Sequence, residues 1–322
     1  MSNPLTTIVI GSRGSPLALW QSHWVKNELE KIYHDLKVTI EIIKTTGDRI
    51  LDSPLSTIGD KGLFTKEIEH ALLDGTIDLA VHSLKDLPTI LPKGLSIGAI
   101  TKREDVRDVF IAHPEKQYRH FDELPTGATI ATGSLRRKCQ LMRWRSDLRI
   151  VDIRGNLNTR FTKLDESDWD GMILARAGVL RLGMENRITE ILPIEKLLPA
   201  VGQGALAIEI RENDKRILKY INKLANETTT VATIGERAFL RYLEGGCQVP
   251  IGTYGRIEEN EFKLDALIGS LDGKKVVRGK IRGAPEQAEE LGKELAKTLY
   301  ESGGDEILER IRGRIPSERP TV

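Results

Sequence analysis

The strongest constraint on the fold is a pattern that occurs twice in the chain. A strand rich in β-branched residues runs into a short glycine-bearing turn and then into a helix capped by serine. In the first copy the strand at 6–10 leads to Ser15 and Pro16, which suit a helix N-cap and the first helical position. In the second copy the strand at 128–132 leads to Ser134. Strands that alternate with helices predict parallel sheets covered by helices.

Hydrophobic periodicity extends this alternation along the first two thirds of the chain. The further strands are expected at 38–43, 76–82, 149–153 and 171–175, and the helices at 17–29, 63–73, 135–144 and from 159 to 164. The pattern changes near residue 223. The elements expected beyond it are a helix at 230–243, strands at 249–256, 261–269 and 275–282, and a helix at 285–302. This last part is therefore a separate α+β unit of about 100 residues.

Composition excludes several classes of protein. The 322 residues carry 48 basic and 47 acidic side chains, so the net charge of +1 does not favour nucleic acid or membrane binding. No apolar run approaches the roughly 20 residues of a membrane span, and the start of the chain does not resemble a signal peptide. With two cysteines and six scattered histidines, we expect a reduced cytoplasmic protein without a metal site.

Positive charge is nevertheless concentrated between residues 136 and 160, where eight basic side chains face two acidic ones. A solvated basic face is one interpretation. Several of these arginines, and Arg13, stand at turns where a strand gives way to a helix. Free N–H groups and the helix dipole favour anions there, and arginine binds carboxylates at two points. We therefore favour a ligand with several carboxylates. The sequence has no P-loop motif for a nucleoside triphosphate.

Two further positions could carry chemistry. Lys85 and Asp86 follow a strand; they form either a plain surface ion pair or a site where an aspartate moves protons and stabilises a developing cation. Cys247 stands on a loop after two glycines, which suits covalent attachment or nucleophilic chemistry. Cys139 lies within a predicted helix and suits a buried structural role.

Five motifs resemble those of the hydroxymethylbilane synthase (porphobilinogen deaminase) family, in the same order. They are Ser12 to Gln21 (SRGSPLALWQ), His82 to Pro88 (HSLKDLP), Ser134 to Arg137 (SLRR), Arg154 to Asn156 (RGN) and Glu244 to Gly252 (EGGCQVPIG). The last resembles the family's cofactor-attachment signature. The matches run from residue 8 to beyond residue 252.

The resemblance implies an α/β fold with two similar periplasmic-binding-protein-like domains, mixed and mainly parallel sheets, and a smaller α+β C-terminal domain. It places domain 1 at 1–102 and 200–222, domain 2 at 103–199, and domain 3, with the cysteine loop, at 223–322. It also implies an active-site cleft between the first two domains.

The resemblance further implies a transferase of porphyrin, tetrapyrrole and haem biosynthesis. Such an enzyme joins four porphobilinogen molecules head to tail and releases ammonia each time, giving hydroxymethylbilane. A dipyrromethane cofactor would be held by a thioether to Cys247, and Asp86 would be the catalytic aspartate. Lys61 would lie in a mobile loop. The positions matching acetate- and propionate-binding residues are Arg13, Ser15, Lys85, Ser134, Arg136, Arg137, Arg154, Arg160 and Arg181.

Three residues depart from the family pattern: Thr57, Asn158 and Arg176, of which Arg176 is either an extra ligand contact or merely exposed. Two rival functions remain open. A binding module without catalysis would explain the arginines but not Cys247 or Asp86. A nucleic-acid binder would use the basic segment, but aromatic residues make up only 5% of the chain, which argues against stacking on bases. The resemblance favours a cytoplasmic monomer that binds no nucleic acid and no membrane.

Overall fold

The structure is a computed structural model, and it describes residues 6–49, 65–243 and 249–313. The chain folds into two compact units. One comprises Met1–Leu51, Lys61–Glu104 and Gly204–Thr230, and the other comprises Asp52–Asp60, Asp105–Gln203 and Val231–Val322. The division of the chain into three domains at the bounds given above stays a prediction.

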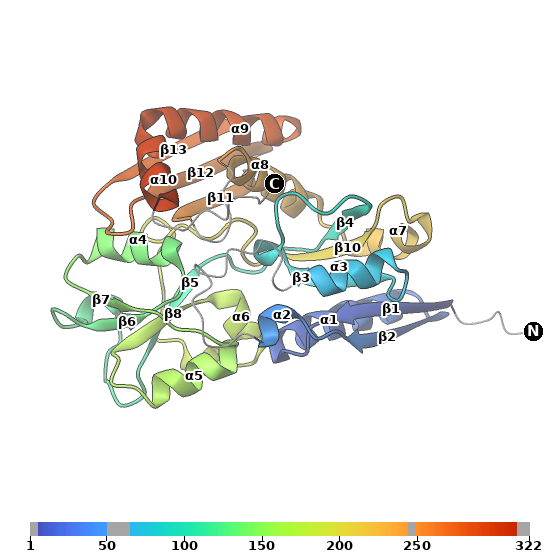
Figure 1. The fold of residues 1–322 in the computed structure, drawn as a ribbon, viewed down its shortest axis with the longest axis horizontal. Coiled ribbons are helices and arrows are strands. Elements are labelled where there is room, and N and C mark those ends of the chain that lie inside the picture. The colour runs from blue at the N-terminus through green and yellow to red at the C-terminus, as the bar shows by residue number, and fades with distance from the viewer. Residues whose placement is uncertain (1–5, 50–64, 244–248, 314–322) are drawn as a thin grey trace, which may run out of the picture. The chain divides into compact units, whose positions relative to one another are not determined.

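The first unit is built on a five-stranded sheet with the order β2-β1-β3-β10-β4. Its strands are β1 (Thr6–Ser12), β2 (Leu36–Ile42), β3 (Leu79–Ser83), β4 (Leu95–Ile100) and β10 (Leu206–Arg211). Strand β1 runs parallel to β2 and β3, whereas β10 runs antiparallel to β3 and β4. The helices of this unit are α1 (Pro16–Ile32), α2 (Thr46–Arg49), α3 (Lys66–Leu73) and α7 (Lys215–Ile221), and Figure 1 labels them.

The second unit contains a five-stranded sheet with the order β7-β6-β8-β5-β9. Its strands are β5 (Asp108–Ala112), β6 (Thr129–Ala131), β7 (Arg149–Val151), β8 (Gly171–Ala175) and β9 (Glu190–Ile191), and its helices are α4 (Leu135–Trp144), α5 (Leu157–Asp165) and α6 (Arg176–Arg181). Here β6 runs parallel to β7 and β8, and β5 runs antiparallel to β8 and β9. The sequence of strand directions is therefore the same in both sheets, which confirms two similar α/β sheets of mixed direction.

The rest of the second unit is a three-stranded antiparallel sheet with the order β11-β12-β13. Its elements are β11 (Ile251–Glu258), β12 (Glu261–Gly269), β13 (Val276–Gly283), α9 (Ala288–Leu299), α10 (Asp305–Arg312) and the part of α8 (Glu227–Tyr242) from Val231 onward. Helix α9 packs against β12 and β13 (Figure 1). Its buried side chains, among them Leu295 and Leu299, join Phe262 and Leu264 of the sheet in one apolar cluster.

Both capped turns form as the sequence predicts. The Ser15 hydroxyl accepts a hydrogen bond from the Ala18 N–H, and the Ser134 hydroxyl accepts one from the Arg137 N–H. Helix α4 and strands β8 and β12 have the predicted bounds. The helix predicted at 285–302 is divided: Pro285–Gln287 form a 3₁₀ turn, α9 spans Ala288–Leu299, and the turn Tyr300–Gly304, in which Gly303 has a φ of 106°, separates α9 from α10.

The pattern analysis missed two strands of each sheet, β4 and β10 in the first unit and β5 and β9 in the second. Strand β10 is almost entirely buried, so its sequence lacks the alternation that marks a half-exposed strand. Strands β5 and β10 are also the antiparallel members of their sheets, and each follows a point where the chain passes from one unit to the other. Within the described residues, no helix is long and apolar enough to cross a membrane.

Candidate active site

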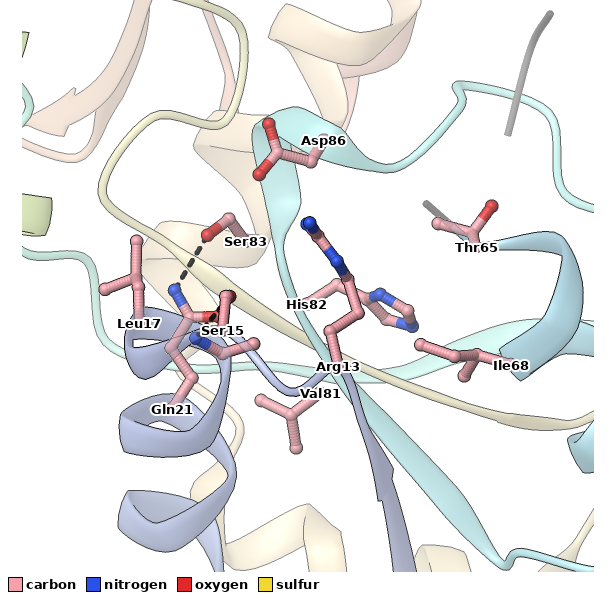
Figure 2. A pocket seen from close by; sticks show the side chains of 11 residues that line it. Arg13, Ser15, Leu17, Gln21, Thr65, Ile68, Val81, His82, Ser83 and Asp86 are labelled. Atoms are coloured by element: carbon pink, nitrogen blue, oxygen red, sulfur yellow. Dashed lines mark hydrogen bonds between the residues drawn. The ribbon is translucent and has the colours of Figure 1, made fainter. Parts of the chain in front are cut away.

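A pocket that opens to solvent lies at the carboxyl ends of β1 and β3 in the first unit; its space is about 460 Å³ when the open solvent at its mouth is included. The polar side chains that line it are Arg13, Ser15, Gln21, Thr65, His82, Ser83 and Asp86 (Figure 2). Three residues predicted from the sequence, Arg13, Ser15 and Asp86, are thus brought together. Ligands commonly bind beyond the carboxyl ends of strands in α/β sheets.

One wall of the pocket is the turn between β1 and α1. Ser15 is the N-cap of α1, and its Oγ lies 3.4 Å from the N–H nitrogen of Ala18. Pro16 follows at the first helical position. Arg13 precedes the cap and is half-buried. This wall therefore presents a guanidinium and a hydroxyl at a helix N-terminus, a combination that suits an anionic group.

The opposite wall is the end of β3 and the 3₁₀ turn Leu84–Asp86. Gln21 of α1 donates a hydrogen bond from Nε2 to the Ser83 hydroxyl at 2.8 Å, which joins the two walls. Asp86 is exposed and lines the pocket, whereas the half-buried Lys85 lies on the same turn without lining it. The pocket therefore holds an accessible carboxylate close to positive charge.

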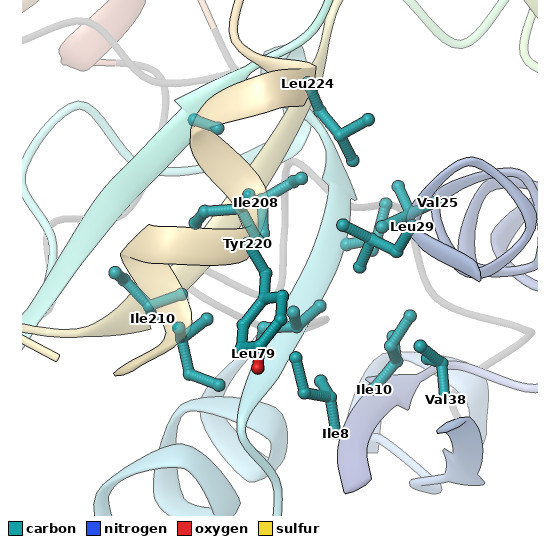
Figure 3. Close-up of a cluster of buried hydrophobic side chains, with 14 of the residues drawn as sticks. Ile8, Ile10, Val25, Leu29, Val38, Leu79, Ile208, Ile210, Tyr220 and Leu224 are labelled. Atoms are coloured by element: carbon teal, nitrogen blue, oxygen red, sulfur yellow. The ribbon is translucent and has the colours of Figure 1, made fainter. Parts of the chain in front are cut away.

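The two faces of β3 have different surroundings. Leu79 and Val81 pack into the apolar core of the unit with Ile208 and Ile210 of β10; Figure 3 shows part of this cluster. On the other face, His82 lines the pocket, and its Nε2 lies 3.0 Å from Oε2 of Glu209.

Sequence reasoning missed four of the pocket's polar residues: Gln21, Thr65, His82 and Ser83. A signal was present for His82, which stands two residues from the buried Ala80 on a strand and so shares its face.

Arg136 and Arg137 lie on the first turn of α4 and are buried within the second unit. Each donates to the Asp108 carboxylate over 2.8 Å, Arg136 from Nη1 and Arg137 from Nη2. Gln203 donates to the same carboxylate over 2.9 Å. Although burial alone would raise the pKa of the Asp108 carboxyl, the two guanidiniums hold it well below its usual range. The structure thus shows these arginines in a buried network, and ligand binding by them stays a prediction.

The third arginine turn follows β7. Gly155 adopts a φ of 111°, a conformation that favours glycine, and Asn156 caps α5 by accepting from the Thr159 N–H over 3.0 Å. Arg160 donates from Nε to the Gly155 carbonyl over 2.9 Å. Arg154 lies 3.9 Å from the Asp152 carboxylate. The turn itself therefore holds Arg160 in place.

Helix α6 carries two more arginines of interest. Arg176, one of the departures from the family pattern, donates to the Asp105 carboxylate over 2.6 Å. Asp105 also accepts hydrogen bonds from the Arg107 side chain, so the aspartate lies between two guanidiniums. Arg176 is thus an ion-pair partner within its unit. Arg181 ends the same helix and is half-buried.

Three residues singled out from the sequence, Thr57, Lys61 and Cys247, lie outside the described residues. Cys139 is fully buried, and burial raises the pKa of its thiol to about 12, which confirms its structural role. Asn158 is exposed on α5. Among the residues that the structure describes, no group of three or more histidine, cysteine or acidic side chains could hold a metal ion.

Two family models match the chain. Residues 8–219 match "Porphobilinogen deaminase, dipyromethane cofactor binding domain", and residues 230–301 match "Porphobilinogen deaminase, C-terminal domain". Together they cover most of the sequence.

Curated relatives agree over nearly the whole length. A porphobilinogen deaminase of Chlorobaculum parvum is 54% identical over 308 residues, which is 95% of this chain and 98% of the relative. One of Carboxydothermus hydrogenoformans is 52% identical over 305 residues, covering 95% and 97% of the two chains.

The solved structures that match this chain share little sequence with it. The VFT2 domain of Bordetella pertussis BvgS is 15% identical and covers 69% of this chain and 87% of that one, with a TM-score of 0.41. The extracellular-binding protein YtmK of Bacillus subtilis, a probable amino-acid transporter component, is 13% identical and covers 74% and 98%, with a TM-score of 0.41.

Proposed function

The chain belongs to the porphobilinogen deaminase family, and from that premise we propose that the Asp86 pocket is the catalytic part of its active site. The enzyme is a hydroxymethylbilane synthase, a transferase of tetrapyrrole biosynthesis. It condenses four porphobilinogen molecules stepwise, releasing ammonia, on a dipyrromethane cofactor.

One observation carries the proposal: an exposed carboxylate lies in a pocket whose other polar groups suit an acidic ligand. Porphobilinogen that loses ammonia becomes a cationic methylene-pyrrole. The Asp86 carboxylate would stabilise that positive charge, and it would accept the proton released when the ring becomes aromatic again. Arg13 and the Ser15 hydroxyl would meanwhile hold a carboxylate of the pyrrole.

The same pocket suits the dipyrromethane, because each of its pyrroles carries acetate and propionate groups and the pocket wall presents Arg13 and a helix N-terminus. When bound, the cofactor supplies the pyrrole carbon to which the first substrate is joined. We assign its attachment to Cys247. The residues assigned to its carboxylates, and to those of the growing chain, are Arg13, Ser15, Lys85, Ser134, Arg136, Arg137, Arg154, Arg160 and Arg181.

For Arg136 and Arg137 the supporting observation is their charge balance. The two guanidiniums share one carboxylate, Asp108, so one positive charge remains in excess on the first turn of α4. A buried charge of this kind acts over a longer range than an exposed one, because water screens it less. Asp108 would thus hold both guanidiniums in place as a positioning residue.

The proposal extends to the molecule's context. Porphobilinogen is the substrate. We infer a cytoplasmic monomer that binds neither nucleic acid nor a membrane, divided into domains at 1–102 with 200–222, 103–199 and 223–322. The similar topology of the two five-stranded sheets supports the first two of these domains.

Intact-protein mass spectrometry tests the attachment site. Protein from a host that makes porphobilinogen should exceed the mass of the bare chain by two linked pyrroles, and Cys247→Ala should have the bare mass. Cys139→Ala is the matched control, because Cys139 is buried and should leave the added mass intact. A bare mass for the unaltered protein would favour a binding module, and added mass on Cys247→Ala would move the anchor elsewhere.

A further inference from the structure

A buried histidine that lines the pocket lies beside a buried glutamate that does not line it. Side-chain exposure is 6% for His82 and 0% for Glu209, and His82 Nε2 lies 3.0 Å from Glu209 Oε2. Within the described residues, neither Glu209 oxygen accepts a hydrogen bond. An ionised carboxylate removed from water is costly unless a positive group lies beside it. The imidazole of His82 is placed to be that group.

The neighbouring charges favour the same pairing. Glu69 of α3 lies near both residues, and burial, together with the like charge of Glu209, raises the pKa of its carboxyl. Glu209 is the carboxylate within ion-pair distance of His82 among the described residues. His70 also acts on Glu69 from α3.

The other edge of the imidazole is turned to the pocket. Nε2 is among the buried side-chain atoms without a hydrogen bond, whereas Nδ1 is not, and the ring lines the pocket wall. Figure 2 shows the ring between Arg13 and Ile68, on the side of the pocket away from Ser83. With a proton on each nitrogen, Nε2 faces Glu209 and Nδ1 can donate into the pocket. Arg13 and Asp86 are the charged groups that face it there.

We propose that His82 binds a carboxylate of the pyrrole substrate through Nδ1, and that Glu209 is the positioning residue that orients the imidazole. This rests on the proposed function of the pocket. Each porphobilinogen carries two carboxylates, and within the described lining Arg13 is the one guanidinium. An imidazole N–H beside it supplies a partner for the second carboxylate. A histidine–carboxylate pair of this kind fixes the orientation of the ring and determines which ring nitrogen carries a proton.

Steady-state kinetics with porphobilinogen tests the proposal. His82→Gln should raise KM about tenfold and change kcat less than about threefold, the range expected for one charge-assisted hydrogen bond. The matched control is His113→Gln, because His113 is also buried with an unpartnered Nε2 but does not line the pocket. The KM of His113→Gln should equal that of the unaltered enzyme.

Glu209→Gln separates positioning from direct binding. It should raise KM less than His82→Gln does, and the double variant should be no worse than His82→Gln alone, since both remove one interaction.

The outcomes distinguish this inference from the proposed function. An unaltered KM in His82→Gln would overturn the role of His82 while leaving turnover and cofactor attachment untouched. If His82→Gln does not fold, folded Glu209→Gln decides, and an unaltered KM there overturns the pair. A failure of the proposed function would instead appear as an unaltered enzyme that carries no cofactor.

Discussion

The two five-stranded sheets have the same order of strand directions, yet the antiparallel strand that is fourth in each order has a different role. Each contains an antiparallel strand that carries a carboxylate with no solvent exposure, Glu209 on β10 and Asp108 on β5. Asp108 receives hydrogen bonds from two arginines and a glutamine. Glu209 has only the imidazole of His82 within ion-pair distance among the described residues. One sheet thus has a closed network, and the other leaves a titratable group open to a pocket.

The capped turns differ in the same way. In the first unit the arginine stands two residues before the serine cap, so Arg13 lies on the turn and reaches the pocket. In the second unit the arginines stand two and three residues after the cap, so Arg136 and Arg137 lie on the helix and are buried. The place of the arginine relative to the cap decides whether it faces a ligand or the interior.

The largest expected effect is on the closed network. Asp108→Ala should lower the free energy of unfolding by about 3–5 kcal/mol, because it leaves two buried guanidiniums without their shared carboxylate. Hydrogen exchange of the backbone amides of β5 and β8 measures this loss in the free energy of unfolding. The control is Asp165→Ala, which removes a surface ion pair and should stay within about 0.5 kcal/mol. A loss as small as the control's would show that the network is dispensable.

The same network predicts a pH dependence. The depressed pKa of Asp108 means that its stabilisation is complete above the ordinary aspartate pKa of about 3.9 and is lost only as pH falls through the lower, folded value. The difference in stability between the unaltered protein and Asp108→Ala should therefore stay constant from neutral pH to about pH 5. If the difference in stability between the two proteins shrank near pH 6, the pH dependence would belong to a group other than Asp108.

The next effect concerns the open pocket. Asp86→Asn should fold and keep its cofactor but lose turnover about 100-fold or more, because the amide neither accepts a proton nor carries charge. The measurement is kcat with porphobilinogen, with hydrogen exchange of β3 to show that the fold is unchanged. Near-normal turnover would remove Asp86 from the mechanism.

A smaller effect compares the caps. Ser15→Ala and Ser134→Ala should each weaken their own helix by about 1 kcal/mol, since both hydroxyls accept from the N–H three residues on over 3.4 Å. Hydrogen exchange of α1 and α4 measures each separately. Unequal losses would show that one serine has a structural partner beyond its helix.

The smallest effect is at Glu69. Because its carboxyl has a raised pKa, the folded state binds a proton more tightly than the unfolded chain, and stability declines as pH rises through the folded value. Glu69→Gln should remove that decline, raising stability at pH 8 by less than about 1 kcal/mol and leaving it unchanged at pH 4. Thermal melting at the two pH values measures it. A variant less stable at pH 8 would show that the charged form is the favoured one.

Local sequence determined much of this protein. Serine before two helices predicted their caps, the strand–turn–helix alternation predicted parallel sheets covered by helices, and five motifs in a fixed order identified the family. These features depend on residues a few positions apart, so the chain itself specifies them. The candidate site was predicted in part, with Arg13, Ser15 and Asp86 now in one pocket.

Tertiary structure alone decided the partners of the buried charges. Asp108 meets Arg136 and Arg137 across 28 and 29 residues, and Gln203 across 95. His82 meets Glu209 because β10 returns antiparallel beside β3, in a register that pairs Ala207 with His82. Strand register and chain return depend on the packing of the whole sheet, and no local pattern records them.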